Sequence, residues 1–143
     1  MKIKRHGSAG WQGGVKDGRG TISTESGALS AYPYGFASRF EGQRGSNPEE
    51  LLAAAHAACF TMALSLILTE AKHTAKAMDT TAEVTLEQSD DGYAITSVHL
   101  DLKASVPGLD EAALRNFATA AKAGCPVSKL FNAEITLTTT LLL

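Results

Sequence analysis

The chain has 143 residues, of which 44% are apolar, and this predicts one globular domain covering residues 1–143. The formal net charge of −2 gives no basic surface for nucleic acid, so no nucleic-acid partner is expected. Residues 1–10 lack the apolar core of a signal peptide, and we therefore expect a cytoplasmic protein. In that compartment a lone pair of cysteines is seldom a structural disulfide.

Residues 1–25 are expected to be extended. Glycine turn signals precede residues 21–24, which have strand composition, so this part predicts a hairpin or meander on a solvated edge. A glycine-rich stretch can also indicate a phosphate-binding loop. No Lys-Ser/Thr pair or helix start follows it, and we exclude that interpretation.

Residues 26–46 are loop-rich, with one short strand expected at residues 34–40. The alternating pattern there predicts that Phe36 and Phe40 face inward. Arg39 then lies on the opposite parity from Phe36, beside Phe40. A lone arginine in such a place is usually a solvated surface group.

Residues 47–70 predict a long helix. Asn47 can accept a hydrogen bond from a free amide of the first turn, and Pro48 suits the first helical position because it needs no donor there. Glu50 follows Asn47 by three residues and can complete a capping box. The start of this helix is therefore the best defined boundary in the chain.

Residues 51–68 contain no charged side chain. The helix is apolar or small on every side, which predicts burial all round, with sheet on one side and another helix on the other. Such a run reaches the lower limit for a membrane span. His56, Thr61 and Ser65 interrupt it and no basic flank anchors it, so we expect no membrane association.

Residues 80–88 and 93–106 predict two strands joined by a hairpin turn at Asp90-Asp91-Gly92. The parity of the apolar residues slips between Ile95 and Val98. A slip of this kind indicates a β-bulge.

Residues 110–123 predict a second helix that Gly124 ends. Its expected apolar stripe consists of Leu109, Ala113, Phe117 and Ala120. A short helix at residues 125–131 and a strand at residues 133–143 complete the chain. Strands flank helices in blocks without regular alternation, which predicts an α+β fold with largely antiparallel sheet.

Glu49 and Cys59 are the residues of the long helix that could do chemistry. They are ten positions apart, or about 15 Å along a helix axis, so they cannot meet within one straight helix. Two copies packed antiparallel would bring Glu49 of one chain near Cys59 of the other, crossing near Ala54, where small residues allow close approach. The spacing therefore indicates a homodimer with sites made from both chains.

Cys59 and Cys125 are either two unrelated buried thiols or reactive groups. Cys125 precedes Pro126 at the start of a helix, where free amides stabilise a thiolate. Cys59 lies mid-helix and needs a cation to lower its pKa. Arg39 is a candidate, and Glu49 could hold its guanidinium in a two-pronged pair.

A metal site is an alternative. His56 and Cys59 are three residues apart and could share a helix face. Together with Cys125 they would give three ligands suited to zinc. Because no C-x-x-C motif is present, His56 is more simply a core histidine that is hydrogen-bonded to a neighbour.

Three motifs together resemble the OsmC/Ohr family of organic hydroperoxide reductases: residues 47–51 (NPEEL), 57–60 (AACF) and 124–128 (GCPVS). Residues 34–36, 39–42 and 79–82 resemble its OsmC branch in particular. The resemblance runs over the full chain. It implies an intertwined α+β homodimer, with long central helices between curved, largely antiparallel sheets.

The resemblance also implies a function. By it, Cys59 is the peroxidatic cysteine, Cys125 the resolving cysteine, and Arg39 and Glu49 the activating pair of a thiol peroxidase. The expected substrate is an organic hydroperoxide, and hydrogen peroxide more weakly, in oxidative and osmotic stress defence. No metal or bound cofactor is expected, only an external dithiol reductant. Two alternatives stay open, a non-enzymatic dimer that binds a small apolar ligand and the zinc site.

Overall fold

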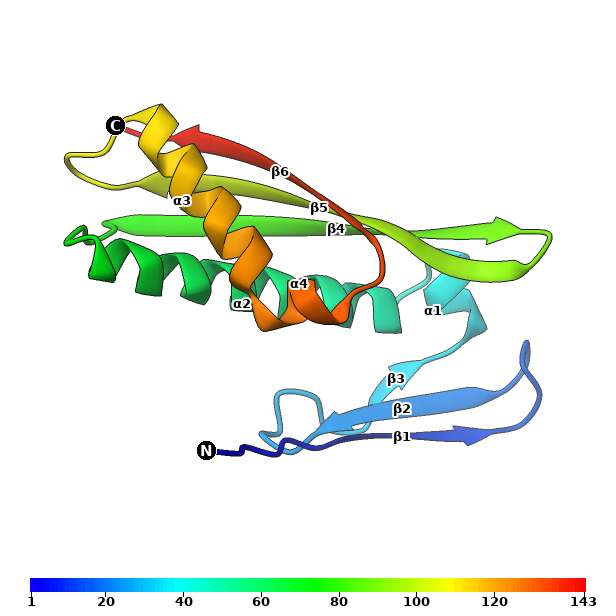
Figure 1. Cartoon of the computed structure of the whole chain (residues 1–143). Coiled ribbons are helices and arrows are strands. Elements are labelled where there is room, and N and C mark those ends of the chain that lie inside the picture. The colour runs from blue at the N-terminus through cyan, green and yellow to red at the C-terminus, as the bar shows by residue number, and fades with distance from the viewer. The chain divides into compact units, whose positions relative to one another are not determined.

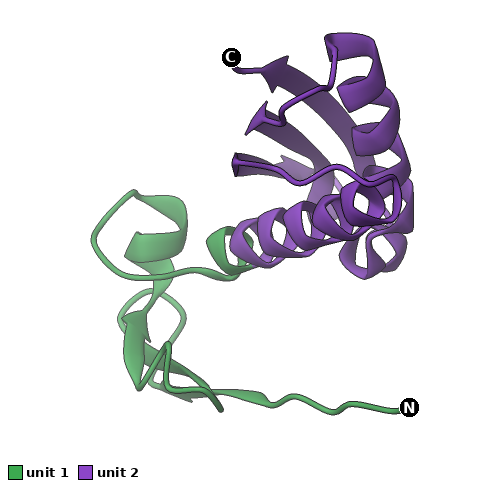
Figure 2. Cartoon of the chain, turned by 90° about the vertical axis from the view of Figure 1, so that its left-hand side faces the viewer, with its two compact units in different colours: residues 1–51 green, residues 52–143 purple.

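The computed structural model describes residues 1–143 and divides them into two compact units, residues 1–51 and 52–143 (Figure 2). Whether they form one domain stays a prediction. The elements, in chain order (Figure 1), are β1 (Gly7–Gln12), β2 (Arg19–Thr24), β3 (Tyr32–Tyr34), α1 (Phe36–Phe40), α2 (Pro48–Glu70), β4 (Ala77–Ser89), β5 (Gly92–Ser105), α3 (Glu111–Gly124), α4 (Pro126–Leu130) and β6 (Glu134–Leu141).

The first unit contains a small antiparallel sheet in the order β1-β2-β3. The hairpin predicted within residues 1–25 is confirmed as β1 and β2, and β3 adds a third strand to it. Gly20 of β2 pairs with Trp11 on one side and Tyr34 on the other. The two rings meet over Gly20 with centroids 5.5 Å apart. A Cβ at Gly20 would overlap both rings, which explains why a residue without a side chain lies between them.

The strand predicted at residues 34–40 was wrong, because residues 36–40 form the helical turn α1. The amide of Gly35 donates to Ser38 Oγ at 2.9 Å, closing the first turn. Phe36 and Phe40 are four residues apart, so a helix also places them on one face, and their ring centroids are 5.0 Å apart. In a segment this short, the strand period of two and the helix period of about 3.6 residues both place Phe36 and Phe40 on the same side.

The start of α2 agrees with its predicted cap. The amide of Glu50 donates to Asn47 Oδ1 at 2.8 Å. The carboxylate of Glu50 accepts from Asn47 Nδ2 at 3.0 Å and from Ser46 Oγ at 3.2 Å. These reciprocal side-chain bonds take the place of the backbone bond of a standard capping box.

All-round burial of α2 is not found in the single chain. Its buried residues lie four apart, at His56, Phe60, Leu64 and Leu68. On length and composition alone this helix could cross a membrane, and only 22% of its most apolar window is buried within the chain. Core helices of soluble proteins meet the same test.

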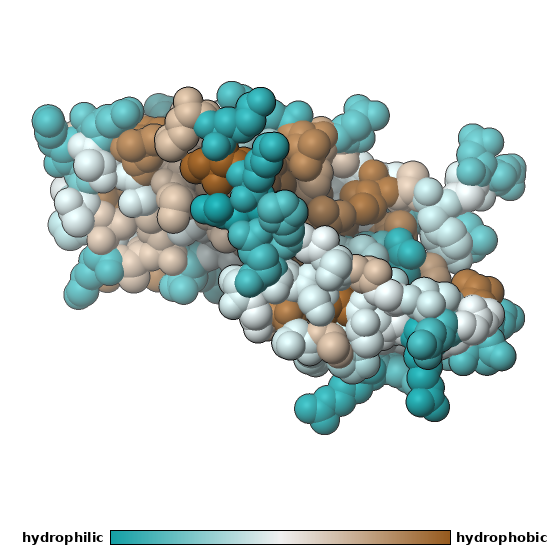
Figure 3. Space-filling view, turned by 90° about the horizontal axis from the view of Figure 1, so that it is seen from below, coloured by the Kyte–Doolittle hydropathy of each residue, from teal (hydrophilic) through white to brown (hydrophobic).

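Apolar side chains lie open on the face that is seen from below (Figure 3). On α2, Met62 keeps 76% of its surface exposed and Leu66 keeps 60%. This stripe of α2 therefore needs cover that its own chain does not supply.

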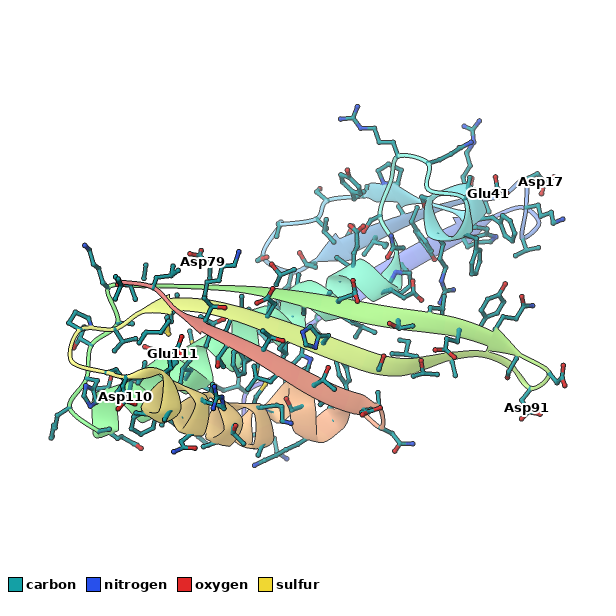
Figure 4. The ribbon with its side chains drawn as sticks, turned by 90° about the horizontal axis from the view of Figure 1, so that it is seen from above. Asp17, Glu41, Asp79, Asp91, Asp110 and Glu111 are labelled. Carbon is teal, nitrogen blue, oxygen red and sulfur yellow. The ribbon has the colours of Figure 1, made fainter.

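The second unit is built on the sheet β4-β5-β6. The long hairpin β4–β5 is antiparallel and turns at residues 90–91, where Asp91 is labelled in Figure 4. Its register shifts opposite Thr96, between the pairs Thr85–Ser97 and Leu86–Ile95, which confirms the predicted bulge. β6 pairs with β5 in parallel, so the sheet is antiparallel in part only.

Both long helices pack on the same face of this sheet. Val98, Leu100, Leu102 and Ala104 of β5 share one parity and are buried with Phe60 of α2 and Leu114 of α3. Asp110 (labelled in Figure 4) is the N-cap of α3, and its Oδ1 accepts from the amide of Ala113 at 2.8 Å. The predicted stripe of α3 is confirmed in part, because Leu109 and Phe117 pack against the core. The fully buried residues of the helix are Leu114, Ala118 and Ala121, one position after the predicted ones.

Phe60 lies at the centre of this core with 0% of its surface exposed. We expect Phe60→Ala to lower the free energy of unfolding by about 3–5 kcal/mol, since it removes a buried ring and leaves a cavity. Denaturant unfolding at one fixed protein concentration measures this. The matched control is Leu130→Ala, because Leu130 is 76% exposed and should change the free energy by less than about 0.5 kcal/mol. Equal effects would contradict this description of the core.

Candidate functional site

Cys59 and Cys125 meet in the second unit. Both are free thiols, Cys59 partly buried in α2 and Cys125 fully buried at the residue before α4. The Cys59 thiol lies in hydrogen-bonding range of the Cys125 thiol and of the backbone amide of Val127. The sequence predicted that these residues act together, and the fold brings them into contact from positions 66 residues apart.

The surroundings of Cys59 favour its protonated form. Burial raises the pKa of the Cys59 thiol, and the Cys125 side chain raises it further, whereas the amide of Val127 lowers it. A buried thiol without a cation is a poor nucleophile at neutral pH. The predicted lowering of this pKa by Arg39 therefore stays a prediction that needs a positive charge beside Cys59.

Cys125 is the N-cap of α4 and Pro126 its first residue, as expected, and no side chain caps this five-residue helix. The stabilisation of a Cys125 thiolate by the free amides at this helix start stays a prediction. The first turn of α4 also positions Val127, whose amide contacts the Cys59 thiol.

Arg39 and Glu49 form an ion pair within the first unit. Arg39 Nη2 lies 2.7 Å from Glu49 Oε1, and Arg39 Nε donates to the same carboxylate at 3.1 Å and 3.3 Å. Glu49 is only 12% exposed at its side chain, so the guanidinium is held by a largely desolvated partner in the two-pronged geometry. The pairing of these two residues agrees with the prediction, while their role stays a proposal.

A pocket of about 320 Å³ lies beside Arg39 in the same unit. Its lining is mainly aromatic, from Trp11, Tyr34, Phe36 and Phe40. Trp11 and Tyr34 were not predicted from the sequence to line a pocket beside Arg39. One signal was present: five of the nine aromatic residues fall before position 41, where little apolar core was otherwise expected.

His56 is fully buried and faces α4. Its Nε2 lies 2.7 Å from Ser128 Oγ, and Phe131 meets its ring edge-on at 5.1 Å between centroids. A core histidine bonded to a neighbour was predicted correctly. Its Nδ1 has no hydrogen-bond partner within the chain, an arrangement that costs about 1–3 kcal/mol. Burial lowers the pKa of His56, so its ring is neutral at pH 7.

The alternative zinc site is not assembled. His56, Cys59 and Cys125 do not form a group with the geometry to hold a metal ion. The ring nitrogen of His56 that faces α4 is already engaged by Ser128.

Fold and site define a class of α+β protein in which a free cysteine on a long apolar helix lies beside a second free cysteine at the start of a short helix. The profile of the OsmC-like protein family matches residues 40–140. Peroxiredoxin OsmC of Escherichia coli (strain K12) is 55% identical over 137 residues, 96% of each chain. An organic hydroperoxide resistance protein of Xanthomonas axonopodis pv. citri is 33% identical over 70% of this chain and 69% of its own.

The fold agrees with these relatives. The crystal structure of an organic hydroperoxide resistance protein from Elizabethkingia anophelis superposes with a TM-score of 0.73 at 27% identity, covering 99% of this chain and 100% of the other. This chain belongs to the OsmC/Ohr family, on its OsmC branch.

Proposed function

We propose that this chain is a cysteine-based peroxidase that reduces organic hydroperoxides to alcohols, in defence against oxidative and osmotic stress. The observation that carries the proposal is the pair of free thiols in mutual contact, Cys59 and Cys125, in a chain 55% identical to a peroxiredoxin. The Arg39–Glu49 ion pair and the aromatic pocket beside Arg39 support the proposal, since this chemistry needs a positive charge and an apolar pocket. We expect the protein to act in the cytoplasm.

The first step forms a sulfenic acid. The Cys59 thiolate attacks the terminal oxygen of the hydroperoxide, so that an S–O bond forms, the O–O bond breaks, and the alkoxide leaves and takes up a proton. Arg39 stabilises both the thiolate and the charge on the leaving oxygen, and Glu49 holds the guanidinium in place. The Arg39–Glu49 ion pair supports this role because it leaves one edge of the guanidinium for a reacting anion.

The second step forms a disulfide. The Cys125 sulfur attacks the Cys59 sulfur, the S–O bond breaks, and hydroxide leaves as water once it has taken a proton. An external dithiol then exchanges with the disulfide and restores both thiols. No metal or bound cofactor has a part in this cycle.

The functional unit is a homodimer in which each site draws on both chains. Glu49 and Cys59 are ten residues apart on the continuous helix α2, about 15 Å along its axis. The exposed stripe of α2 with Met62 and Leu66 supports a second copy as its cover. An antiparallel partner would place Glu49 and its arginine near Cys59 of the other chain.

The aromatic pocket beside Arg39 supports a preference for organic hydroperoxides. A volume of about 320 Å³ accommodates an alkyl or aryl group of several carbons, and each buried CH₂ contributes about 0.8 kcal/mol. Hydrogen peroxide has no group to bury there.

Peroxide consumption with a panel of dithiols tests the function. We expect kcat/KM for a bulky alkyl hydroperoxide to exceed that for hydrogen peroxide by at least about tenfold, which corresponds to two buried CH₂ groups. A reaction that does not distinguish the two peroxides would contradict the substrate class. Binding of an alkyl group without consumption under any dithiol would favour the non-enzymatic ligand binder.

A further inference from the structure

The short helix α4, which follows Cys125, and its C-cap Phe131 both contact the ring of His56 on α2. Val127 contacts the Cys59 thiol through its amide, Ser128 hydrogen-bonds to His56 at 2.7 Å, and Phe131 packs edge-on against the same imidazole. Two of these three contacts are made by His56. The imidazole thus occupies the point at which α4 meets the helix of Cys59.

The chemistry of His56 indicates why a histidine occupies this point. The residue is fully buried, and its Nδ1 has no partner in the chain. A leucine would fill similar space without an unpaired nitrogen. What the imidazole adds is Nε2, whose only partner is a hydroxyl three residues after Cys125.

We propose that His56 is a positioning residue for the resolving step, in which its hydrogen bond to Ser128 holds α4 so that the Cys125 sulfur stays within reach of the Cys59 sulfenic acid. The inference rests on the proposed function. It assigns to His56 and Ser128 an effect on disulfide formation alone, and none on the reaction with peroxide. In that step the Cys125–Cys59 S–S bond forms, the S–O bond of Cys59 breaks, and water leaves. His56 touches neither substrate nor reductant.

The consequence is a competition for the sulfenic acid. While Cys125 is held close, condensation outruns a second peroxide molecule, and the sulfenic acid is protected from oxidation to sulfinic acid. If α4 is released, the first step continues and the second slows. A protein in which α4 is released should therefore be inactivated at lower peroxide concentrations than the wild type.

The test follows the two steps separately after mixing the full-length protein with an alkyl hydroperoxide. His56→Leu and Ser128→Ala should each form sulfenic acid within about twofold of the wild-type rate. Condensation to the disulfide should slow about tenfold, the ratio that corresponds to one net hydrogen bond. Sulfinic acid, measured by mass spectrometry, should accumulate correspondingly.

Three further variants separate positioning from general loss of structure. His56→Gln places an amide, which can either donate to or accept from the Ser128 hydroxyl, near the position of Nε2 and should restore condensation to within about threefold of wild type. The double variant His56→Leu/Ser128→Ala should be no slower than either single variant, because both remove one bond. Thr80→Val removes a bond of the same length between α2 and β4, from Thr61 Oγ1 to Thr80 Oγ1 at 2.7 Å, and should leave both steps within about twofold.

The proposal is overturned if condensation is unchanged in both single variants, if the first step slows by the same factor, or if Thr80→Val slows condensation equally. If the wild type forms its disulfide and the His56 and Ser128 variants form it equally fast, the inference fails while the proposed function stands. A wild-type protein that forms no Cys59–Cys125 disulfide would overturn the proposed function and this inference together.

Discussion

Replacing Cys59 by serine is expected to abolish peroxide turnover, with a loss of about 10⁴-fold or more, as is found when a catalytic nucleophile is removed. A serine hydroxyl cannot form the sulfenic acid on which the cycle depends. Replacing Cys125 by serine should leave the first step intact. One equivalent of peroxide per chain should be consumed, and a sulfenic acid that a 1,3-diketone reagent traps should accumulate on Cys59.

The two cysteine variants are controls for each other. The two thiols lie in contact range of each other. Their burial differs, because Cys59 is partly exposed whereas Cys125 is buried. A peroxide can therefore reach Cys59 more readily. If Cys59→Ser retained the first step and Cys125→Ser lost it, the two roles would be reversed.

A mixed dimer of Cys59→Ser and Glu49→Ala chains should regain activity that neither homodimer has. We expect Glu49→Ala to reduce kcat/KM by about 100-fold, because Arg39 loses the carboxylate that orients it. If each site takes Cys59 from one chain and Glu49 from the other, one site of the heterodimer carries both lesions and the other carries none. The purified heterodimer should then show about half of wild-type activity.

Separate affinity tags on the two chains allow the heterodimer to be isolated and assayed. Mixing Cys59→Ser with wild-type chains is the matched control, and it should give one active site per heterodimer under either arrangement. Should the Cys59→Ser/Glu49→Ala heterodimer stay as inactive as its parents, each site lies within one chain. A monomer with full activity would contradict the shared site directly.

Local rules determined much of this fold. Bonds between residues three or fewer apart define three of its boundaries. These are the start of α2 at Asn47-Pro48, the cap of α3 at Asp110 and the turn between β4 and β5. The bulge at Thr96 could be predicted because a single extra residue reverses the parity of every side chain after it. The same local logic failed at α1, since over five residues the patterns of strand and helix coincide for Phe36 and Phe40.

Chemical complementarity determined part of the site. A carboxylate two residues inside a helix and an arginine shortly before it are natural partners, and Arg39 and Glu49 do form an ion pair. The aromatic pocket was not foreseen, because Trp11 and Tyr34 meet only through the register of β1 and β3 on either side of Gly20.

Tertiary structure decided what surrounds the two cysteines. His56 and Ser128 are 72 positions apart and bond at 2.7 Å, and no periodicity within α2 or α4 relates them. The entropic cost of closing so long a loop is offset by the burial of the whole core of β5, α2 and α3, and not by the contact between His56 and Ser128 alone. The sequence by itself therefore determined which residues could react, through their chemical type and local caps, whereas the packing of α3 and α4 on α2 decided which of them are neighbours.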